Sequence, residues 1–181
     1  EAWNHLLINY PTDDATIVAF MRLADVTAEK ADLSGALNYL EQIVTQFPGS
    51  PKIPAVMLRQ GELLSEMGRA DEAREKYQYI LRVPEWRGIL HARALYQIGE
   101  SYMAEDAYAK AHGFYERTFL GYPHLAEWSA RAYLADAKAL IGMGEKQDAI
   151  NTLNEAVVEI SATAPADILK SIKAKLKELQ G

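Results

Sequence analysis

Four alanines recur along this chain at a nearly constant spacing. Intervals of 37, 38 and 38 residues separate them, and they are Ala36, Ala73, Ala111 and Ala149. Twelve residues before each alanine stands another small residue, and these four are Ala24, Gly61, Gly99 and Ala137. An internal period of this length is typical of stacked supersecondary units, each of which buries its apolar face only against its neighbours. The sequence therefore predicts a repeat protein.

Large side chains follow the alanines at helical intervals. Four residues after the alanines come Leu40, Tyr77, Tyr115 and Leu153. Offsets of three, four and seven residues place side chains on one face of a helix. Each alanine and its upstream small residue are therefore predicted to lie on two neighbouring helices. Both are small because this lets the two helices approach closely where they cross.

The predicted helices form four pairs, and no sustained alternation of polar and apolar residues indicates a strand. The pairs span residues 14–29 with 33–46, 53–67 with 70–82, 89–104 with 107–120, and 126–142 with 146–160. Single helices are predicted before them at 1–9 and after them at 166–179. We expect one solenoid domain over residues 1–181, with a half-repeat at 1–11, repeats at about 14–48, 53–84, 89–123 and 126–161, and a capping helix at 166–180.

Two segments resemble the tetratricopeptide repeat (TPR) family. They are ALYQIGESY at 94–102 and AKAHGFYERTFLGYP at 109–123, and residues 56–81 are nearly as similar. The resemblance covers residues 14–161 and implies an all-α, right-handed superhelical solenoid of stacked antiparallel helix pairs. The family repeat is about 34 residues long, so the longer period here places extra residues between helix pairs. The junction at 122–134 resembles bacterial cell-envelope proteins of the outer-membrane assembly and Tol–Pal accessory kind. This favours the periplasm, with the cytoplasm as the alternative.

The two ends of the chain differ in character. Trp3 and Leu6 occupy the repeat positions of Tyr115 and Thr118, so the chain is expected to begin inside a second helix without its partner. Truncation of a longer array, a disordered upstream segment and pairing with another molecule would each account for this. The last helix has an apolar stripe with lysines on its other faces, which predicts a cap on the solenoid. A helix lying on an anionic membrane is the alternative.

Composition and motifs argue against several functions. The chain has no cysteine, which excludes thiolate catalysis and cysteine-based zinc sites. Neither a glycine-rich phosphate loop nor a nucleophile elbow occurs, and the four histidines lack zinc-protease spacing. The net charge of −6 disfavours nucleic acid, and no apolar run reaches the ~18 residues of a membrane helix. We therefore expect no catalysis, cofactor, metal site or integral membrane segment.

The candidate binding site is the concave groove that the TPR resemblance implies along the first helix of each pair. Its candidate residues are Met21, Asp25, Leu58, Glu62, Arg93, Tyr96, Glu100, Met103, Arg131, Leu134 and Lys138. This set is acidic early, basic late and apolar at its centre. The alternative is that these side chains only fill the inner curve or pack against another part of the parent protein. The asparagine that chaperone-binding members use to hold a peptide carboxylate is absent, which argues against that activity.

Three functions remain after these exclusions. The favoured one is a non-catalytic scaffold, within a longer bacterial protein, that binds a protein or peptide partner in the groove. The second is a structural module of a cell-envelope assembly, with self-association through the N-terminal half-repeat. The third is a regulatory domain of a larger enzyme. Trp86 and Trp128 each follow a junction proline and are expected to fill gaps between repeats.

Overall fold

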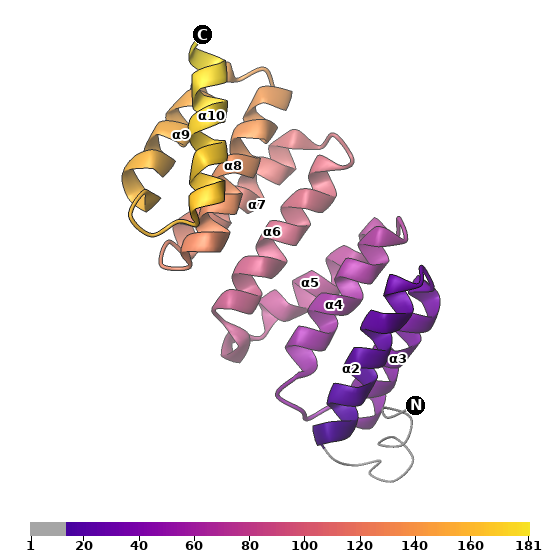
Figure 1. The fold of residues 1–181 in the computed structure, drawn as a ribbon. Helices are drawn as coiled ribbons and strands as arrows, with labels where there is room; N and C mark the ends of the chain where they lie inside the picture. The colour runs from indigo at the N-terminus through magenta and orange to yellow at the C-terminus, as the bar shows by residue number, and fades with distance from the viewer. Residues whose placement is uncertain (1–13) are drawn as a thin grey trace. The chain divides into compact units, whose positions relative to one another are not determined.

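The computed structural model describes residues 14–181, and this part of the chain is helical without any strand (Figure 1). Its elements are α2 (Asp14–Glu29), α3 (Leu33–Gln46), α4 (Ile53–Glu66), α5 (Ala70–Arg82), the 3-10 turn η1 (Pro84–Trp86), α6 (Ile89–Met103), α7 (Tyr108–Gly121), α8 (Ala126–Gly142), α9 (Lys146–Ile160) and α10 (Ala166–Gln180). The predicted helices from residue 14 onward agree with these bounds to within one residue. The helix predicted at 1–9 lies outside the described residues.

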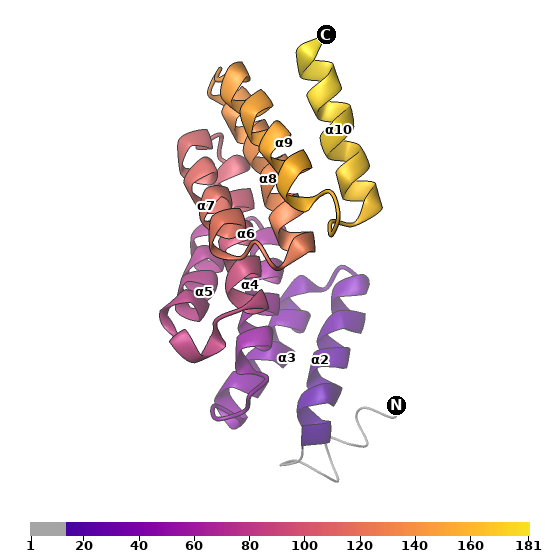
Figure 2. The ribbon, with the colours of Figure 1, turned by 90° about the vertical axis from the view of Figure 1, so that its left-hand side faces the viewer.

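The chain divides into two compact units, residues 1–83 (unit 1) and 84–181 (unit 2). In the described part of unit 1, α2 packs against α3, α4 packs against α5, and α3 joins the two pairs through α4. In unit 2, α6 pairs with α7 and α8 with α9, while α7 and α6 both contact α8. The last helix, α10, lies beside α9 and α8 (Figure 2). The described part of each unit thus holds two antiparallel helix pairs, and unit 2 also contains α10.

A glycine faces a tyrosine ring inside two of the helix pairs. A Cβ atom on Gly61 of α4 would lie 2.3 Å from Cε1 of Tyr77 on α5. A Cβ atom on Gly99 of α6 would lie 2.5 Å from Cε1 of Tyr115 on α7. Both tyrosines are fully buried. The prediction that the small residues permit close approach of neighbouring helices is therefore confirmed at these two crossings.

All four turns within the helix pairs have the same form. Each contains one residue in the left-handed region, and these are Ala31, Gly68, Asp106 and Gly144. In each turn the next backbone N–H donates to the carbonyl five residues earlier, as Arg69 does to Leu64 at 2.8 Å. This is the Schellman closure of a helix C-terminus, in which glycine is favoured. The first and third pairs reach it with Ala31 and Asp106, although a left-handed residue with a Cβ costs about 1–2 kcal/mol.

The C-terminal helix completes the core of unit 2. Ile168, Ile172 and Leu179 of α10 are buried in the same apolar cluster as residues of α8 and α9. Its apolar stripe is therefore covered within the unit, as the capping prediction requires. Among the described residues no helix is long and apolar enough to cross a bilayer.

Candidate functional site

The predicted groove residues of unit 1 lie on α2 and α4 and differ in exposure. Met21 and Asp25 border a shallow cleft of about 430 Å³, whose other lining residues are Val18, Arg22, Lys52 and Ala55. Leu58 is only 1% exposed. Almost none of the Leu58 side chain is therefore accessible to a partner in this structure. Leu58 supports helix packing instead.

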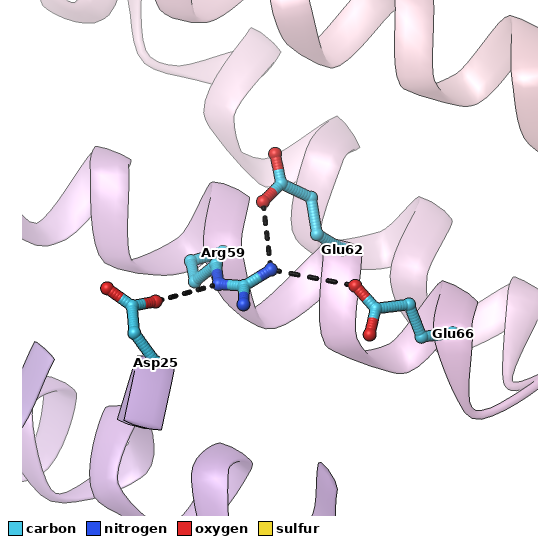
Figure 3. Close-up of polar contacts among 4 residues, drawn as sticks. All are labelled: Asp25, Arg59, Glu62 and Glu66. Carbon is cyan, nitrogen blue, oxygen red and sulfur yellow. Dashed lines mark hydrogen bonds and ion pairs between the residues drawn. The ribbon is translucent and has the colours of Figure 1, made fainter. Parts of the chain in front are cut away.

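The two predicted acidic residues of unit 1 share one cation, Arg59 of α4 (Figure 3). The Nε of Arg59 lies 3.3 Å from Asp25 Oδ1, and its Nη1 lies 3.4 Å from Glu62 Oε2. A third carboxylate, Glu66, is 3.6 Å from the same Nη1. Sequence reasoning missed Arg59. Its spacing to Glu62 fits an ion pair within one helix, but its contact with α2 depends on how the two helices pack.

Replacing Arg59 with glutamine is expected to lower the free energy of unfolding by about 1 kcal/mol. The change removes three ion pairs of a partly exposed network, each worth a few tenths of a kcal/mol, and leaves three carboxylates close together. The loss should shrink in 1 M salt, which screens charges beyond about 3 Å. Urea unfolding at low and high salt measures it.

The matched control for this prediction is Arg69→Gln. Among residues 14–181, Arg69 forms its ion pair with Glu72, at the start of α5 and at an exposed site. We expect its effect on unfolding to be clearly smaller than that of Arg59→Gln. Equal effects for the two variants would show that the shared network adds nothing to the stability of unit 1.

In unit 2, aromatic and basic side chains gather around Trp128 at the start of α8. The guanidinium carbons of Arg93 and Arg131 lie 5.4 and 5.6 Å from the indole ring centre. Tyr96 meets the same indole edge-on, with ring centres 5.7 Å apart. Trp128 thus fills the space between α6 and α8, as its place after a junction proline predicts. Cations over an aromatic face gain about 0.5–1 kcal/mol at exposed sites, so the indole helps to fix the two arginines.

A cleft of about 270 Å³ adjoins this cluster, between α8 and α10. Four predicted groove residues line it, and they are Tyr96, Arg131, Leu134 and Lys138. The opposite wall comes from the first turn and a half of α10 and consists of Asp167, Ile168 and Ser171. The sequence did not predict this wall. We call these seven residues, with Ala135 at the base, the α8–α10 cleft.

The remaining predicted residues of unit 2 lie outside the lining of this cleft. Glu100 is exposed and accepts a hydrogen bond from the hydroxyl of Tyr115 at 2.5 Å. Met103 is half-buried and packs against the apolar core of unit 2. Arg93 lies over the indole of Trp128 and does not line the cleft. The predicted set therefore divides into residues that share a cleft and residues that have structural partners.

The charges along the cleft are unevenly balanced. Arg131 forms an ion pair with Glu127, one turn earlier on α8, at 2.9 Å, and both side chains are about half exposed. Lys138 is exposed and forms no ion pair with any residue in 14–181. Burial and the nearby Glu100 carboxylate raise the pKa of Tyr96 above its ordinary value. The phenol therefore stays neutral over the physiological range, and Lys138 is the cation of the cleft without an ion pair among residues 14–181.

Sequence reasoning also missed a contact between a buried aspartate and a histidine elsewhere in unit 2. Asp136 of α8 is fully buried, and its Oδ1 lies 2.6 Å from Nδ1 of His112 on α7. Its second oxygen, Oδ2, has no hydrogen-bond partner in the described part of the chain. Burial raises the pKa of Asp136 to about 6, and the hydrogen bond from His112 opposes this rise. The local sequence offers no signal for this contact, since Asp136 lies among alanines on an otherwise apolar helix face.

The site contains no arrangement that suggests covalent chemistry. Among residues 14–181, no group of three or more His, Asp or Glu side chains is placed to hold a metal ion. The α8–α10 cleft is shallow and exposed, and its polar groups are two cations, an acid and hydroxyls. Such a surface is suited to noncovalent contact, because arginine and aromatic side chains are enriched where proteins bind one another.

Comparison with known proteins agrees with this class of helical-repeat protein. Residues 18–50 and 55–83 match the family model of the tetratricopeptide repeat. A comparison with curated proteins gave no match, whereas 103 chains of solved structures match.

Three of these structures illustrate the similarity. PilW, described as a widely conserved type IV pilus biogenesis factor, is 16% identical with a TM-score of 0.71, covering 99% of this chain and 76% of PilW. MamA is 19% identical with a TM-score of 0.67, covering 87% of this chain and 84% of MamA. TPR-like repeats of a putative kinesin light chain from Podosopora anserina are 15% identical with a TM-score of 0.69, covering 94% and 87%.

These findings confirm an all-α, helical-repeat solenoid as the fold class. The family match lies in unit 1 and the structural matches extend over most of the chain. Together they show similarity to the tetratricopeptide repeat over residues 18–50 and 55–83 and a shared fold over most of the chain.

Proposed function

We propose that this chain is a non-catalytic scaffold, part of a longer bacterial protein, that binds a segment of a partner protein. The observation that carries the proposal is the cluster of Arg93, Tyr96, Trp128 and Arg131 beside the α8–α10 cleft. Tryptophan, tyrosine and arginine are the residue types that contribute most to binding energy at interfaces. Here they lie together on the first helices of two neighbouring pairs, α6 and α8.

The cluster is also ordered before any partner binds. Arg131 is held on one side by the indole of Trp128 and on the other by Glu127. Binding to ordered side chains loses less conformational entropy, which amounts to about 0.5–1.5 kcal/mol for each side chain that would otherwise become immobilised.

The proposed setting is a cell-envelope assembly. Its support is the similarity to PilW, whose description names pilus biogenesis, together with the junction at 122–134. Light scattering of the purified chain would separate this scaffold role from self-association, because a stable dimer or larger assembly would favour the structural module instead.

The test is a selection of random dodecamer peptides on the full 181-residue chain, followed by binding measurements on the enriched peptides. Reversing both charges, with Arg93→Glu and Arg131→Glu together, is expected to weaken binding at least tenfold, since two aromatic-held cations are lost. The control is Arg117→Glu, because Arg117 also lies over an aromatic ring, Phe114, but belongs to the second helix α7.

Circular dichroism must first show that the charge-reversed chain is folded. If the double variant is not fully folded, the single variant Arg131→Glu is used for the binding test, because the Arg131 side chain is about half exposed. Absence of any enriched peptide, or equal binding by the Arg93/Arg131 and Arg117 variants, would contradict the proposed site.

A further inference from the structure

We propose that the α8–α10 cleft receives an acidic side chain of the bound segment, with an apolar side chain of the segment beside it. The inference rests on the proposed function and specifies its partner: a segment with Asp or Glu next to a large apolar residue. Lys138 and Arg131 hold the carboxylate, and Leu134 and Tyr96 contact the apolar neighbour.

The cations lie on one face of α8. Arg131, Leu134 and Lys138 follow one another at offsets of three and four residues, which places them on adjacent turns of the same face. All three line the cleft. Arg131 already has Glu127 as a partner, whereas Lys138 forms no ion pair with any other residue from 14 to 181. Lys138 is therefore the charge that an incoming carboxylate would balance.

The opposite wall limits what the cleft accepts. Asp167 of α10 faces the same space, and its carboxylate repels a second acid close by. Glu127 already balances Arg131, so Lys138 is the cation of the lining that has no ion pair among residues 14–181. One acidic side chain pairs with Lys138, and a run of acids would meet repulsion from Asp167 on α10. The inference is therefore of a single acid in the cleft rather than a polyanion.

The size of the cleft favours a side chain over a small-molecule ligand. Its volume of about 270 Å³ lies below the roughly 300–1,000 Å³ of typical small-molecule pockets. Tyr96 and Leu134 are each half-buried, so each offers part of an apolar surface at the mouth. Two neighbouring side chains of a peptide fit this combination of a charged end and an apolar edge.

Two observations on the enriched dodecamers test the inference. Their sequences are expected to contain Asp or Glu next to Leu, Ile, Phe, Tyr or Trp. Replacing that acid by its amide is expected to weaken binding to the wild-type chain about tenfold. The change Lys138→Glu is expected to weaken the acidic peptide to a similar extent and to bind a peptide with lysine in place of the acid more tightly than the wild-type chain does.

The matched control is Lys170→Glu, which makes the same change in charge at an exposed lysine of α10 that does not line the cleft. It should alter binding less than threefold. Equal effects at the two lysines, or enriched peptides without acidic residues, would overturn the inference while leaving the scaffold function in place. If no peptide is enriched, the proposed function itself fails.

Discussion

Replacing Gly99 with alanine is expected to destabilise this chain by about 1–3 kcal/mol, although the same change usually stabilises a helix interior by about 0.5–1 kcal/mol. The added Cβ would lie 2.5 Å from the ring of Tyr115, which is fully buried and hydrogen-bonded to Glu100. Because the buried ring of Tyr115 has no free space to move into, the close contact is relieved by moving α6 away from α7. Urea unfolding followed by tryptophan fluorescence reports the loss, because Trp86 and Trp128 both lie in unit 2.

The control is Gly113→Ala in the middle of the facing helix α7. A Cβ at Gly113 would have no atom within 4 Å, so this variant is expected to gain the usual helix stabilisation of about 0.5–1 kcal/mol. The two glycines belong to one helix pair and differ in what lies opposite them. Opposite signs for the two alanine variants would isolate the effect of the tyrosine ring.

A second variant tests the pairing directly. Tyr115→Leu reproduces the combination in the first and last repeats, where Ala24 and Ala137 are matched by Leu40 and Leu153. The double variant Gly99→Ala with Tyr115→Leu should therefore lose less stability than the sum of the two single changes, by about 1–3 kcal/mol. Simple additivity would mean that the glycine is not required by the ring.

This pairing explains why the helix pairs were predictable from sequence. A glycine with a tyrosine, or an alanine with a leucine, recurs at fixed offsets because both residues lie in one local hairpin. The bounds of the helices follow from the same periodicity. The turns were harder to predict. Gly68 and Gly144 are the residue type expected in the left-handed conformation, but Ala31 and Asp106 adopt the same conformation in the other two turns. There the hydrogen bonds of the hairpin override the preference of the residue.

The candidate site was predictable only in part, because its contacts join helices that are distant in sequence. Helical periodicity places Arg131, Leu134 and Lys138 on one face of α8, and the structure places them in one cleft. Periodicity does not reveal that α10 forms the opposite wall of the cleft. It also does not reveal that Asp25 forms an ion pair with Arg59. Periodicity also distinguishes the faces of a helix, but it does not show how far neighbouring helices cover each face. The burial of Leu58 could therefore not be predicted from the sequence.

Replacing Asp136 with asparagine is expected to stabilise the chain at neutral pH and to have little effect at pH 4. Burial raises the pKa of this carboxyl from 3.8 to about 6. Between these values the folded state keeps a proton that the unfolded state releases, so stability falls as pH rises through this range. Each pKa unit corresponds to about 1.4 kcal/mol, and the gain from asparagine should therefore increase by about 2–3 kcal/mol between pH 4 and pH 7.5.

Asparagine isolates the charge because it keeps the shape of the side chain and a hydrogen-bonding oxygen for His112. The Glu116 carboxylate on α7 adds to the cost of ionising Asp136, whereas the hydrogen bond from His112 reduces it. The complementary change His112→Ala removes that relief, so it should destabilise the chain more at pH 7.5 than at pH 4. Urea unfolding of the three chains at both pH values gives the comparison. A gain from Asp136→Asn that is the same at both pH values would show that the pKa of Asp136 is the same in the folded and the unfolded chain, and would contradict the raised pKa; the cost of its buried, unpartnered oxygen would then be one of hydrogen bonding alone.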